Sequence, residues 1–431
     1  MPKVEVPIVL PEMDECTPQQ IEQKKEFIAK HFPSDDVTTW PVAYRDYPKE
    51  DLDSVAYKFL TARKWVMEDA SLMFTETIKY RAERNLDNIP LFPSAIPMRG
   101  YDQQAIMKQF NLEPRAETEE VDKLGRATRP YYHSGFHYWD KSGHPILYEL
   151  TGRTKVKHLV KVYKSFARVG EKASRPCIDY HIHQNECGGK LVRYMDATMG
   201  KELGRRINTA TVVLDFHNLS YGSLFGEAID IMKEAWEVDK SYYPEGMHRL
   251  FAINCPKMIM FAYNIVKGSL DKRIQSKIVF CNPDQTTETL LQVIDAKYLP
   301  KFLGGECECE GGCIPMEKEG EDEAGDGDVL TEEITIPAGK DIRKKFALEV
   351  GSETAWEYES TTEKDIEFSV IFVPEGADDS KAITVVKPTK CKVDSGSYKA
   401  EAKGDLTIVW CNKFSWMNSK TLRLRAFQIK S

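Results

Sequence analysis

The sequence lacks any apolar run of the roughly 20 residues that a membrane-spanning helix requires. It also lacks an excess of positive charge, because 59 Lys and Arg residues stand against 67 Asp and Glu residues, so we expect no nucleic-acid partner. The first 15 residues contain acids and prolines in place of the basic and then apolar regions of a signal peptide. We therefore expect a cytoplasmic protein whose 10 cysteines are mostly reduced thiols.

Motifs of common enzymes are missing as well. The nearest approach to a nucleophile elbow is GSLFG at residues 222–226, where Ser223 stands second instead of central. The sequence has no G-x-G-x-x-G after a strand, no Walker loop and no HExxH. Asp215 and His217 are close in sequence, but this spacing at the end of a strand is typical of polar packing. We therefore predict that the protein is not an enzyme.

The negative charge is concentrated in one segment. Residues 306–328 hold ten acids and one lysine, so the rest of the chain has a net charge of +1. This segment is rich in glycine and almost free of large apolar residues, which indicates a solvated linker. A chain of 431 residues is long enough for two or three domains, and we place a domain boundary here.

Residues 241–282 read as strand, helix and strand. RLFAINCP and SKIVFCN are short and nearly continuous apolar runs, which is typical of parallel strands buried on both faces. Between them, Lys257–Leu270 is apolar on every side of a helix. Such a helix is a core element, a membrane element or the wall of an apolar cavity.

The other elements follow from hydrophobic periodicity. Before Leu52 we expect one charged helix in a mobile lead-in, and from Leu52 a pair of helices. We then expect a β-hairpin at 130–151, a long helical region at 157–200, a buried strand at 209–220, an amphipathic helix at 223–243, and a further helix after residue 285. Residues 329–431 change to short alternating strands with polar turns, which predicts a β-sandwich.

Several motifs accompany these elements: FLTARKW at 59–65, a D-K-x-G-x-P turn at 140–145, YYPE at 242–245, SKI at 276–278 and FLGG at 302–305. Together they resemble the Sec14 or CRAL-TRIO lipid-binding domain, an α/β fold with an N-terminal helical part. In that family the segment that corresponds to 241–282 carries a strand of the lipid pocket and a mobile gate helix. The end of the chain is similar to a GOLD domain at Trp410, Asn412, Ser415, Trp416, Lys420 and Thr421.

The resemblance implies a division of the chain into a lead-in (1–45), a helical part (46–95), a lipid-binding domain (96–305), an acidic linker (306–328) and a GOLD β-sandwich (329–431). It also implies which residues contact the headgroup of a bound phosphatidylinositol. These are Arg63, Lys64, Asp140, Pro145, Glu245 and Lys277. A phosphate buried beside apolar tails needs cations and donors to offset its desolvation. At two further positions of the family's headgroup site, this chain has a different residue from the family, Gly246 in place of Arg and Ile274 in place of Thr.

The tails and the gate are assigned to a second set of residues: Phe136, Leu147, Ala210, Val212, Phe251, Ile253, Met258, Phe261, Ile265 and Ile274. The family's phosphatidylcholine binders have two tyrosines at the positions of Phe136 and Leu147. They have a serine and a threonine at the positions of Ala210 and Val212. The loss of these hydroxyls argues against a choline lipid in the same geometry and leaves room for a more apolar second ligand.

Metal sites are not expected. His181 and His183 form a lone H-x-H, and no third ligand stands at a convincing spacing. Cys307, Cys309 and Cys313 offer three thiols without the paired C-x2-C of a zinc site, so unpaired or redox-sensitive thiols are favoured over a metal. We therefore expect no cofactor other than a bound lipid.

The sequence thus predicts a monomeric lipid-binding and lipid-transfer protein that meets membranes transiently, with Golgi or endosomal membranes as the expected surfaces. The alternative is a lipid-sensing adaptor whose GOLD-like domain contacts proteins or membranes.

Overall fold

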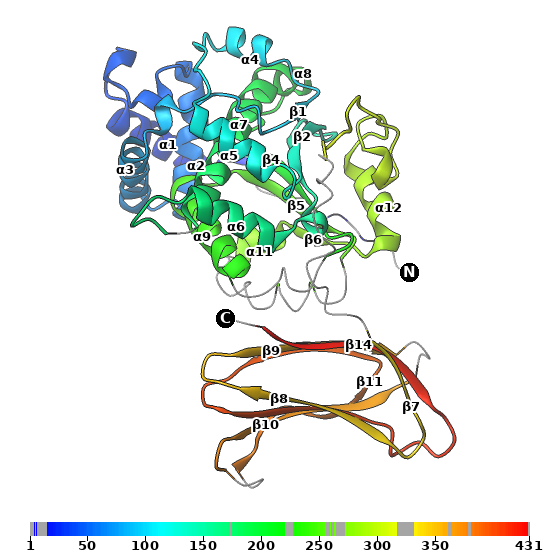
Figure 1. The fold of residues 1–431 in the computed structure, drawn as a ribbon. Helices are drawn as coiled ribbons and strands as arrows, with labels where there is room; N and C mark the ends of the chain where they lie inside the picture. Colours follow the sequence, from blue (N-terminus) through cyan, green and yellow to red (C-terminus); the bar gives the residue numbers. More distant parts are fainter. Residues whose placement is uncertain are drawn as a thin grey trace. The chain divides into compact units, whose positions relative to one another are not determined.

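The computed structural model describes residues 15–172, 174–219, 227–255, 272–316, 332–360, 364–377 and 381–429, together with positions 4, 6, 259 and 263. The chain divides into an α/β unit, which takes most of residues 1–322, and an all-β unit, whose strands lie within residues 332–429 (Figure 1). Each unit has a hydrophobic core of its own.

The predicted helices that fall within the described residues are present in the α/β unit, whereas the helix predicted at 257–270 lies almost entirely outside those residues. The described helices of this unit are α1 (Pro18–His31), α2 (Leu52–Ala62), α3 (Met67–Glu83), α4 (Gln103–Gln109), α5 (Glu119–Thr128), α6 (Val156–Phe166), α7 (Arg175–Met195), α8 (Lys201–Leu203), α9 (Glu227–Tyr242), α11 (Lys272–Ser276) and α12 (Pro283–Val293). The long helical region predicted at 157–200 consists of two helices, because the chain leaves the helix at Ala167 and enters α7 at Arg175.

The first helix, α1, belongs to the helical core. Phe27 is fully buried, and its ring lies 6.1 Å from that of Phe59 in α2 and 5.5 Å from that of Phe74 in α3. Lys24 is also buried, with its Nζ 2.7 Å from Oδ2 of Asp53. The expectation of a mobile lead-in is therefore wrong for α1, because a single large aromatic side chain anchors an otherwise charged helix.

Six strands form the sheet of the α/β unit, in the order β1-β2-β3-β4-β5-β6. They are β1 (Met98–Arg99), β2 (Ser134–Trp139), β3 (Pro145–Glu149), β4 (Ala210–Asp215), β5 (Met247–Ile253) and β6 (Ile278–Phe280). The β2–β3 pair is antiparallel, which confirms the predicted hairpin, and all other neighbours are parallel. The two apolar runs around residues 257–270 are confirmed as the parallel neighbours β5 and β6.

Side chains alternate between the two faces of this sheet. One face, the α12 face, carries Ile146, Tyr148, Val213, Phe251, Ile253 and Val279, which cluster with Leu290, Ile294, Leu299 and Leu303 from α12 and the segment after it. The opposite face, the α7 face, carries Phe136 and Leu147, which cluster with Tyr180, Cys187 and Leu191 of α7.

The segment after α12 returns to the α12 face. Ile314 is 2% exposed and belongs to the same cluster as Tyr148, and Cys313 is 6% exposed. Arg99 of β1 donates from Nη2 to the backbone oxygen of Glu310 at 2.9 Å. The predicted solvated linker is therefore wrong at Cys313 and Ile314, where the chain still packs on the sheet.

The all-β unit is the predicted β-sandwich. Its strands are β7 (Glu332–Ile336), β8 (Asp341–Leu348), β9 (Glu353–Ser360), β10 (Ile366–Pro374), β11 (Ile383–Cys391), β12 (Val393–Lys399), β13 (Gly404–Cys411) and β14 (Lys420–Ile429). They form two antiparallel sheets, in the orders β11-β10-β13-β8 and β12-β9-β14-β7. β13 alternates strictly between buried and half-buried residues, as expected where two sheets enclose one core.

The residues of the GOLD-like signature are placed in two different ways. Trp410 is fully buried in the sandwich core, and Asn412 is buried where its Nδ2 donates to the backbone oxygens of Ile336 and Asn418, both at 3.0 Å. Trp416, in contrast, is 95% exposed. The signature therefore combines a structural clamp with a side chain that has no role in the core.

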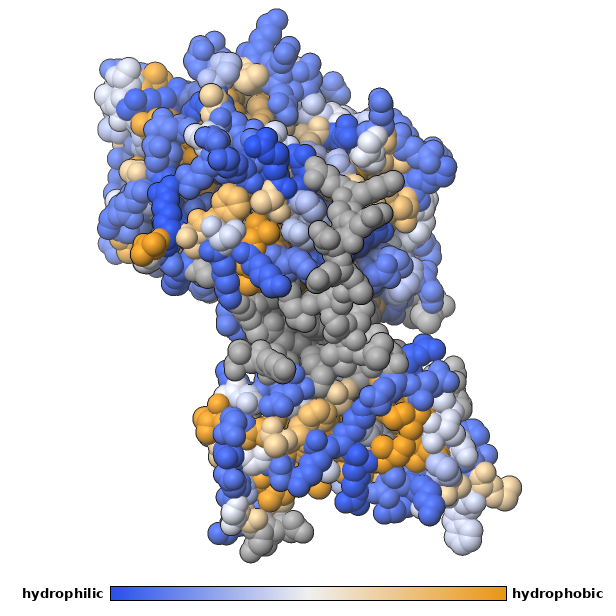
Figure 2. Space-filling model, viewed as in Figure 1, coloured by the Kyte–Doolittle hydropathy of each residue, from blue (hydrophilic) through white to orange (hydrophobic). Residues whose placement is uncertain are grey.

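None of the described helices is both long enough and apolar enough to cross a membrane. On the face shown in Figure 2, hydrophilic residues predominate, and apolar residues form small patches on each unit.

Candidate functional site

The predicted headgroup residues gather at one edge of the parallel sheet. Asp140 directly follows β2 in the turn before β3, and Pro145 is the first residue of β3. Glu245 stands just before β5, and Lys277 stands just before β6. Because β3, β5 and β6 run parallel to each other through β4, their amino ends meet at the same edge. Residues more than a hundred positions apart are thereby brought to one side of the sheet.

Glu245 and Lys277 are in direct contact. Nζ of Lys277 lies 3.3 Å from Oε2 of Glu245 and donates to the backbone oxygen of Met247 at 2.7 Å. Nη1 of Arg273, in α11, donates to Oε1 of Glu245 at 3.2 Å. Lys277 is only 5% exposed, so this is a largely buried cluster of two cations around one carboxylate.

The backbone of Glu245 is strained. Its φ of 52° lies in the left-handed region, where a residue other than glycine costs of order 1 kcal/mol. The two cations that bind the carboxylate hold the side chain in place. Strain of this kind persists where the surroundings determine the conformation, which is common at binding sites.

A third cation, Lys58 of α2, approaches the same cluster. Burial lowers the pKa of Lys58 to about 8, while Glu245 and Asp196 favour its charged form and Lys277 disfavours it. Its ammonium group forms no ion pair with the residues that the structure describes. Lys58 is therefore a half-buried cation that is poised to meet an anionic group.

Further polar side chains continue along the strand ends. The rings of His144 and His248 stack with centroids 3.7 Å apart, and Nη2 of Arg205 lies 2.9 Å from Nε2 of His144. Burial, helped by these neighbours and by Lys277, lowers the pKa of His248 to about 2. His248 is therefore neutral at pH 7, and the positive charge of this edge comes from Lys and Arg.

Asp140 lies at this edge but faces the protein. Its Oδ1 accepts hydrogen bonds from the backbone of Ser142 and His144, at 2.9 and 3.0 Å, and its Oδ2 accepts from Oγ1 of Thr211 at 2.9 Å. These bonds close the turn between β2 and β3 and tie it to β4. Asp140 therefore shapes the site, and its carboxylate is largely occupied by the fold itself.

Arg63 and Lys64 stand at the end of α2, beyond Lys58. Arg63 is half-buried and Lys64 exposed, and Lys64 and Trp65 both have positive φ, of 52° and 65°. This tight exit lets Trp65 donate its backbone N–H to the oxygen of Leu60 at 2.7 Å. Among the described residues, no hydrogen bond joins Arg63 or Lys64 to Glu245, so their place in the headgroup site stays a prediction.

A half-buried apolar surface begins beside the cations. On the α7 face, Phe136 pairs with Leu147, Leu147 with Val212, and Val212 with Leu250. Ala210 pairs with Met247, whose backbone oxygen accepts the bond from Lys277. Phe136 is buried, whereas Leu147, Ala210, Val212 and Leu250 retain partial exposure. The strands thus carry apolar side chains from the cation cluster along one face of the sheet.

Phe251 and Ile253 lie on the other face. Both are fully buried in the cluster of the α12 face, where Phe251 pairs with Val213 and Val279. Their assignment to the same cavity wall as Val212 is therefore wrong. Successive residues of a strand point to opposite faces, and in a parallel sheet both faces are apolar, so the sequence pattern does not reveal which set faces a cavity.

The remaining predicted positions divide into two groups. Ile274 is half-buried in α11, and its backbone oxygen accepts the N–H of Lys277 at 3.0 Å. Met258, Phe261 and Ile265, predicted for the gate, lie outside the described residues.

Sequence reasoning missed Lys58 and Arg273. Lys58 is the only charged residue between Ser54 and Ala62, in a run that otherwise reads as a buried helix. A lone charge in an apolar run is a usable signal of a buried functional cation. Arg273 carried no such signal, because it lies in the charged run DKR before Ile274.

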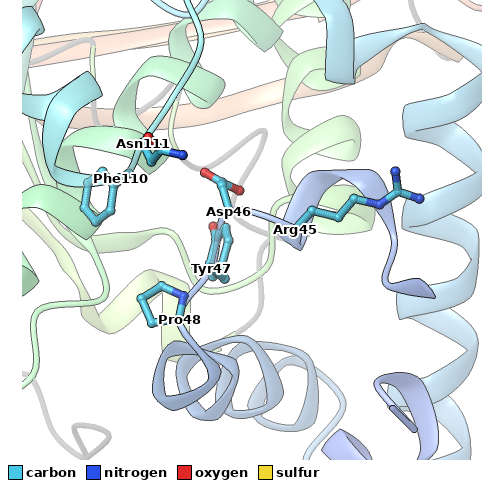
Figure 3. Close-up of a pocket in the computed structure, with 6 residues that line it drawn as sticks. All are labelled: Arg45, Asp46, Tyr47, Pro48, Phe110 and Asn111. Atoms are coloured by element: carbon cyan, nitrogen blue, oxygen red, sulfur yellow. The ribbon is translucent and has the colours of Figure 1, made fainter. Parts of the chain in front are cut away.

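A separate pocket of about 400 Å³ lies elsewhere on the α/β unit. Its lining residues come from the segment before α2 and from the end of α4, and they are Arg45, Asp46, Tyr47, Pro48, Phe110 and Asn111 (Figure 3). Arg193 of α7 pairs with Oδ2 of Asp46 at 2.8 Å and stacks over Tyr47 and Phe110, with 3.6 and 4.3 Å to the ring centroids. The pocket contains none of the predicted lipid-binding residues, and the carboxylate of Asp46 is engaged by Arg193.

Comparison with known families agrees with this architecture. Residues 129–305 match the CRAL/TRIO domain family, and residues 321–431 match a family described as "F28H7_8_C:-like, C-terminal domain". The GOLD assignment therefore stays a prediction, although the all-β fold is confirmed.

Three curated relatives are informative. A phosphatidylinositol/phosphatidylcholine transfer protein, SFH9 of Arabidopsis thaliana, is 30% identical over 275 residues, which cover 63% of this chain and 40% of that protein. SFH11 of the same plant, which has the same description, is 28% identical over 60% of this chain and 58% of that protein. The Sec14 cytosolic factor of Schizosaccharomyces pombe is 25% identical over 61% of this chain and 77% of that protein.

The chain spans less than two thirds of the length of both plant relatives. The α/β unit of this chain contains a CRAL/TRIO domain of the kind found in Sec14-like proteins.

Proposed function

We propose that this protein binds a phospholipid of the phosphatidylinositol type, or another anionic lipid, and exchanges it at membrane surfaces from the cytoplasm. The observation that carries the proposal is the buried cluster of Lys277, Arg273 and Glu245 beside Lys58, at the start of a half-buried apolar face. The proposed function is binding and release of an intact lipid, without a chemical reaction.

The headgroup fits the cation cluster. A phosphate placed among Lys277, Arg273 and Lys58 adds negative charge beside these cations, where Glu245 is now the neighbouring anion. Hydrogen bonds between such charged groups are stronger than those between neutral groups. Glu245 then accepts hydrogen bonds from hydroxyl groups of the inositol ring. Because the site lies at strand ends that the fold holds rigidly, its geometry is largely formed before the lipid arrives.

The tails fit the α7 face. Two acyl chains hold about 30 methylenes, each worth about 0.8 kcal/mol on leaving water, so about 25 kcal/mol of apolar surface has to stay dry during transit. The half-buried side chains of Leu147, Ala210, Val212 and Leu250 supply an apolar wall next to the headgroup cluster. The free energy of moving the tails from the bilayer to the protein is close to zero, because both environments exclude water.

The lipid that co-purifies with the full chain tests this function. Native mass spectrometry with lipid extraction should identify phosphatidylinositol or another anionic lipid in the wild type, and Lys277→Ala should lose it. Lys272→Ala is the matched control, because Lys272 is an exposed lysine of the same α11 segment. A neutral lipid retained equally by all three proteins would contradict the proposed headgroup site.

The all-β unit suggests a second candidate function, contact with an anionic membrane. Trp416 and Met417 are 95% and 90% exposed, and the neighbouring Phe414 carries Nζ of Lys390 and of Lys420 at 4.0 and 3.8 Å from its ring centroid. An exposed tryptophan beside lysines fits the interface of a bilayer with anionic headgroups. If Phe414, Trp416 and Met417, which we call the tip, contact a protein partner instead of a membrane, the domain acts as an adaptor.

Vesicle binding separates these possibilities. The double variant Trp416→Ser/Met417→Ser should bind phosphatidylserine vesicles more weakly than the wild type, while Val350→Ser, at another exposed turn, should not. Equal binding by all three proteins would exclude this tip as a membrane contact.

A further inference from the structure

A histidine of β2 points to the face of the sheet that the Cys-rich segment covers. His137 follows Phe136, and because Phe136 points to the α7 face, His137 points to the α12 face. Its side chain is fully buried, and its ring centroid lies 5.7 Å from that of Tyr148 on the same face. It thus lies under the segment that follows α12.

The three thiols of this segment are held in place by backbone hydrogen bonds. The N–H of Cys307 donates to the oxygen of Leu299, and the oxygen of Cys307 accepts from the N–H of Lys301, both at 3.0 Å. The N–H of Gly312 donates to the oxygen of Cys309 at 2.9 Å. Gly311 and Gly312 have φ of 72° and 91°, a turn that favours glycine and that brings Cys313 back toward the other thiols.

The ligand atoms converge on one point. Nε2 of His137 lies 3.6 Å from Sγ of Cys307 and 3.6 Å from Sγ of Cys309, and these two sulfurs are 3.7 Å apart. With Sγ of Cys313, the four atoms lie within 4.8 Å of one another. A tetrahedral zinc ion with Zn–S of about 2.3 Å and Zn–N of about 2.05 Å places its sulfurs about 3.8 Å apart and sulfur and nitrogen about 3.6 Å apart.

We propose that His137, Cys307, Cys309 and Cys313 bind one Zn²⁺ ion in a closed structural site. Three thiols and one imidazole form a set that zinc prefers, and four protein ligands complete its tetrahedral shell without an open position for catalysis. The thiols release their protons to solvent when the ion binds. This proposal does not depend on the lipid-binding function.

The site joins distant parts of the chain. His137 lies in β2, the strand next to the edge strand β1, whereas the thiols come 170 residues or more later, in the segment that follows α12. Three thiolates and one zinc ion carry a net charge of −1. Arg99, the register partner of His137 in β1, donates to the backbone oxygen of Glu310 within the same segment and supplies a neighbouring positive charge.

The fold thereby changes the interpretation of the thiols. In the sequence, C-x-C-x3-C offers three ligands, and the fourth is absent at any short spacing. The structure supplies the fourth from β2, which explains why a glycine-rich and acidic segment still packs on the sheet. The expectation of free thiols without a metal is replaced by this proposal.

Metal analysis of the full chain tests the site. After expression with added zinc and desalting into chelator-free buffer, the wild type should hold about one zinc ion per chain. Cys309→Ser, which changes a half-buried ligand, should lose most of the zinc. Cys411→Ser, at a half-buried cysteine of β13, should retain it.

Cobalt substitution of the wild type adds a measurement that needs no variant. Co²⁺ should produce the visible bands of a tetrahedral thiolate complex, and added zinc should abolish them. The absence of both zinc and these bands, retention of a full equivalent of zinc by Cys309→Ser, bound iron in place of zinc, or a disulfide among the three cysteines in freshly purified protein would each overturn the proposal.

Discussion

Replacement of Lys277 by methionine removes the charge at the centre of the proposed headgroup site and keeps the length of the side chain. Lys277 is 5% exposed, and its Nζ lies 3.3 Å from Oε2 of Glu245 and donates to the backbone oxygen of Met247 at 2.7 Å. Its loss has two consequences that separate in experiment, one for stability and one for lipid binding.

The cost to stability follows from the carboxylate that is left behind. Removal of one partner of a fully buried ion pair costs about 3–5 kcal/mol, but Arg273 remains 3.2 Å from Glu245, so we expect about 2 kcal/mol. For a unit of this size the melting temperature should fall by about 4 °C. In Lys277→Met/Glu245→Met both members of this pair are gone, and part of the lost stability should return, because removal of both partners costs less than removal of one. The return should be incomplete, because Arg273 also loses its bond to Glu245 and the backbone oxygen of Met247 loses its donor.

Lipid affinity, in contrast, should not be restored in the double variant. A hydrogen bond from a charged group to a phosphate contributes about 1.5–3 kcal/mol, which corresponds to a loss of about 10- to 100-fold in affinity for an anionic lipid. Both the single and the double variant should therefore retain phosphatidylinositol poorly. The thermal unfolding of delipidated protein measures stability, and exchange of labelled phosphatidylinositol from vesicles measures binding.

The reasoning is refuted if the double variant recovers binding together with stability. Lys277 would then act only as the partner of Glu245, and the lipid would be held elsewhere. Lys272→Met, at an exposed position of α11, is the control for a general loss of positive charge.

Three further outcomes are expected. Because burial lowers the pKa of Lys58 to about 8, retention of an anionic lipid should weaken as the pH rises from about 7 to about 9, and Lys58→Met should bind weakly without this pH dependence. Val212→Trp should block lipid uptake with little change in melting temperature, whereas Phe251→Ala should cost about 3–5 kcal/mol of stability, measured by denaturant unfolding, and spare lipid binding. Burial disfavours the charged form of His181, but the carboxylate of Asp239, 2.8 Å away, outweighs burial and raises the pKa of His181. The free energy of unfolding should therefore fall as the pH rises above about 6.5 and through the raised pKa of the folded state. In thermal unfolding, His181→Gln should flatten that pH profile.

Each of these outcomes has a clear opposite. Equal pH dependence in the wild type and Lys58→Met would place the titrating group elsewhere. Lipid loss in Phe251→Ala with normal uptake by Val212→Trp would mean that the tails lie on the α12 face. An unchanged pH profile in His181→Gln would show that the contact between α7 and α9 is not linked to proton binding.

The sequence by itself determined the kinds of element and their order. The helices α2 and α3, the β2–β3 hairpin, the parallel neighbours β5 and β6 and the β-sandwich follow from periodicity, because a local alternation of apolar residues depends on the geometry of one element alone. The headgroup residues were found through literal motifs, and Glu245 and Lys277 do meet in the structure.

Only the tertiary structure decided what each element faces. Phe251 and Val212 are equally apolar in sequence, yet they lie on opposite faces of the sheet, because both faces of a parallel sheet are covered. His137 meets Cys307 across 170 residues, a proximity to which no local pattern contributes. Local physics specifies strands and helices, whereas the pairing of distant ones, and hence the composition of a site, is determined by how the whole chain packs.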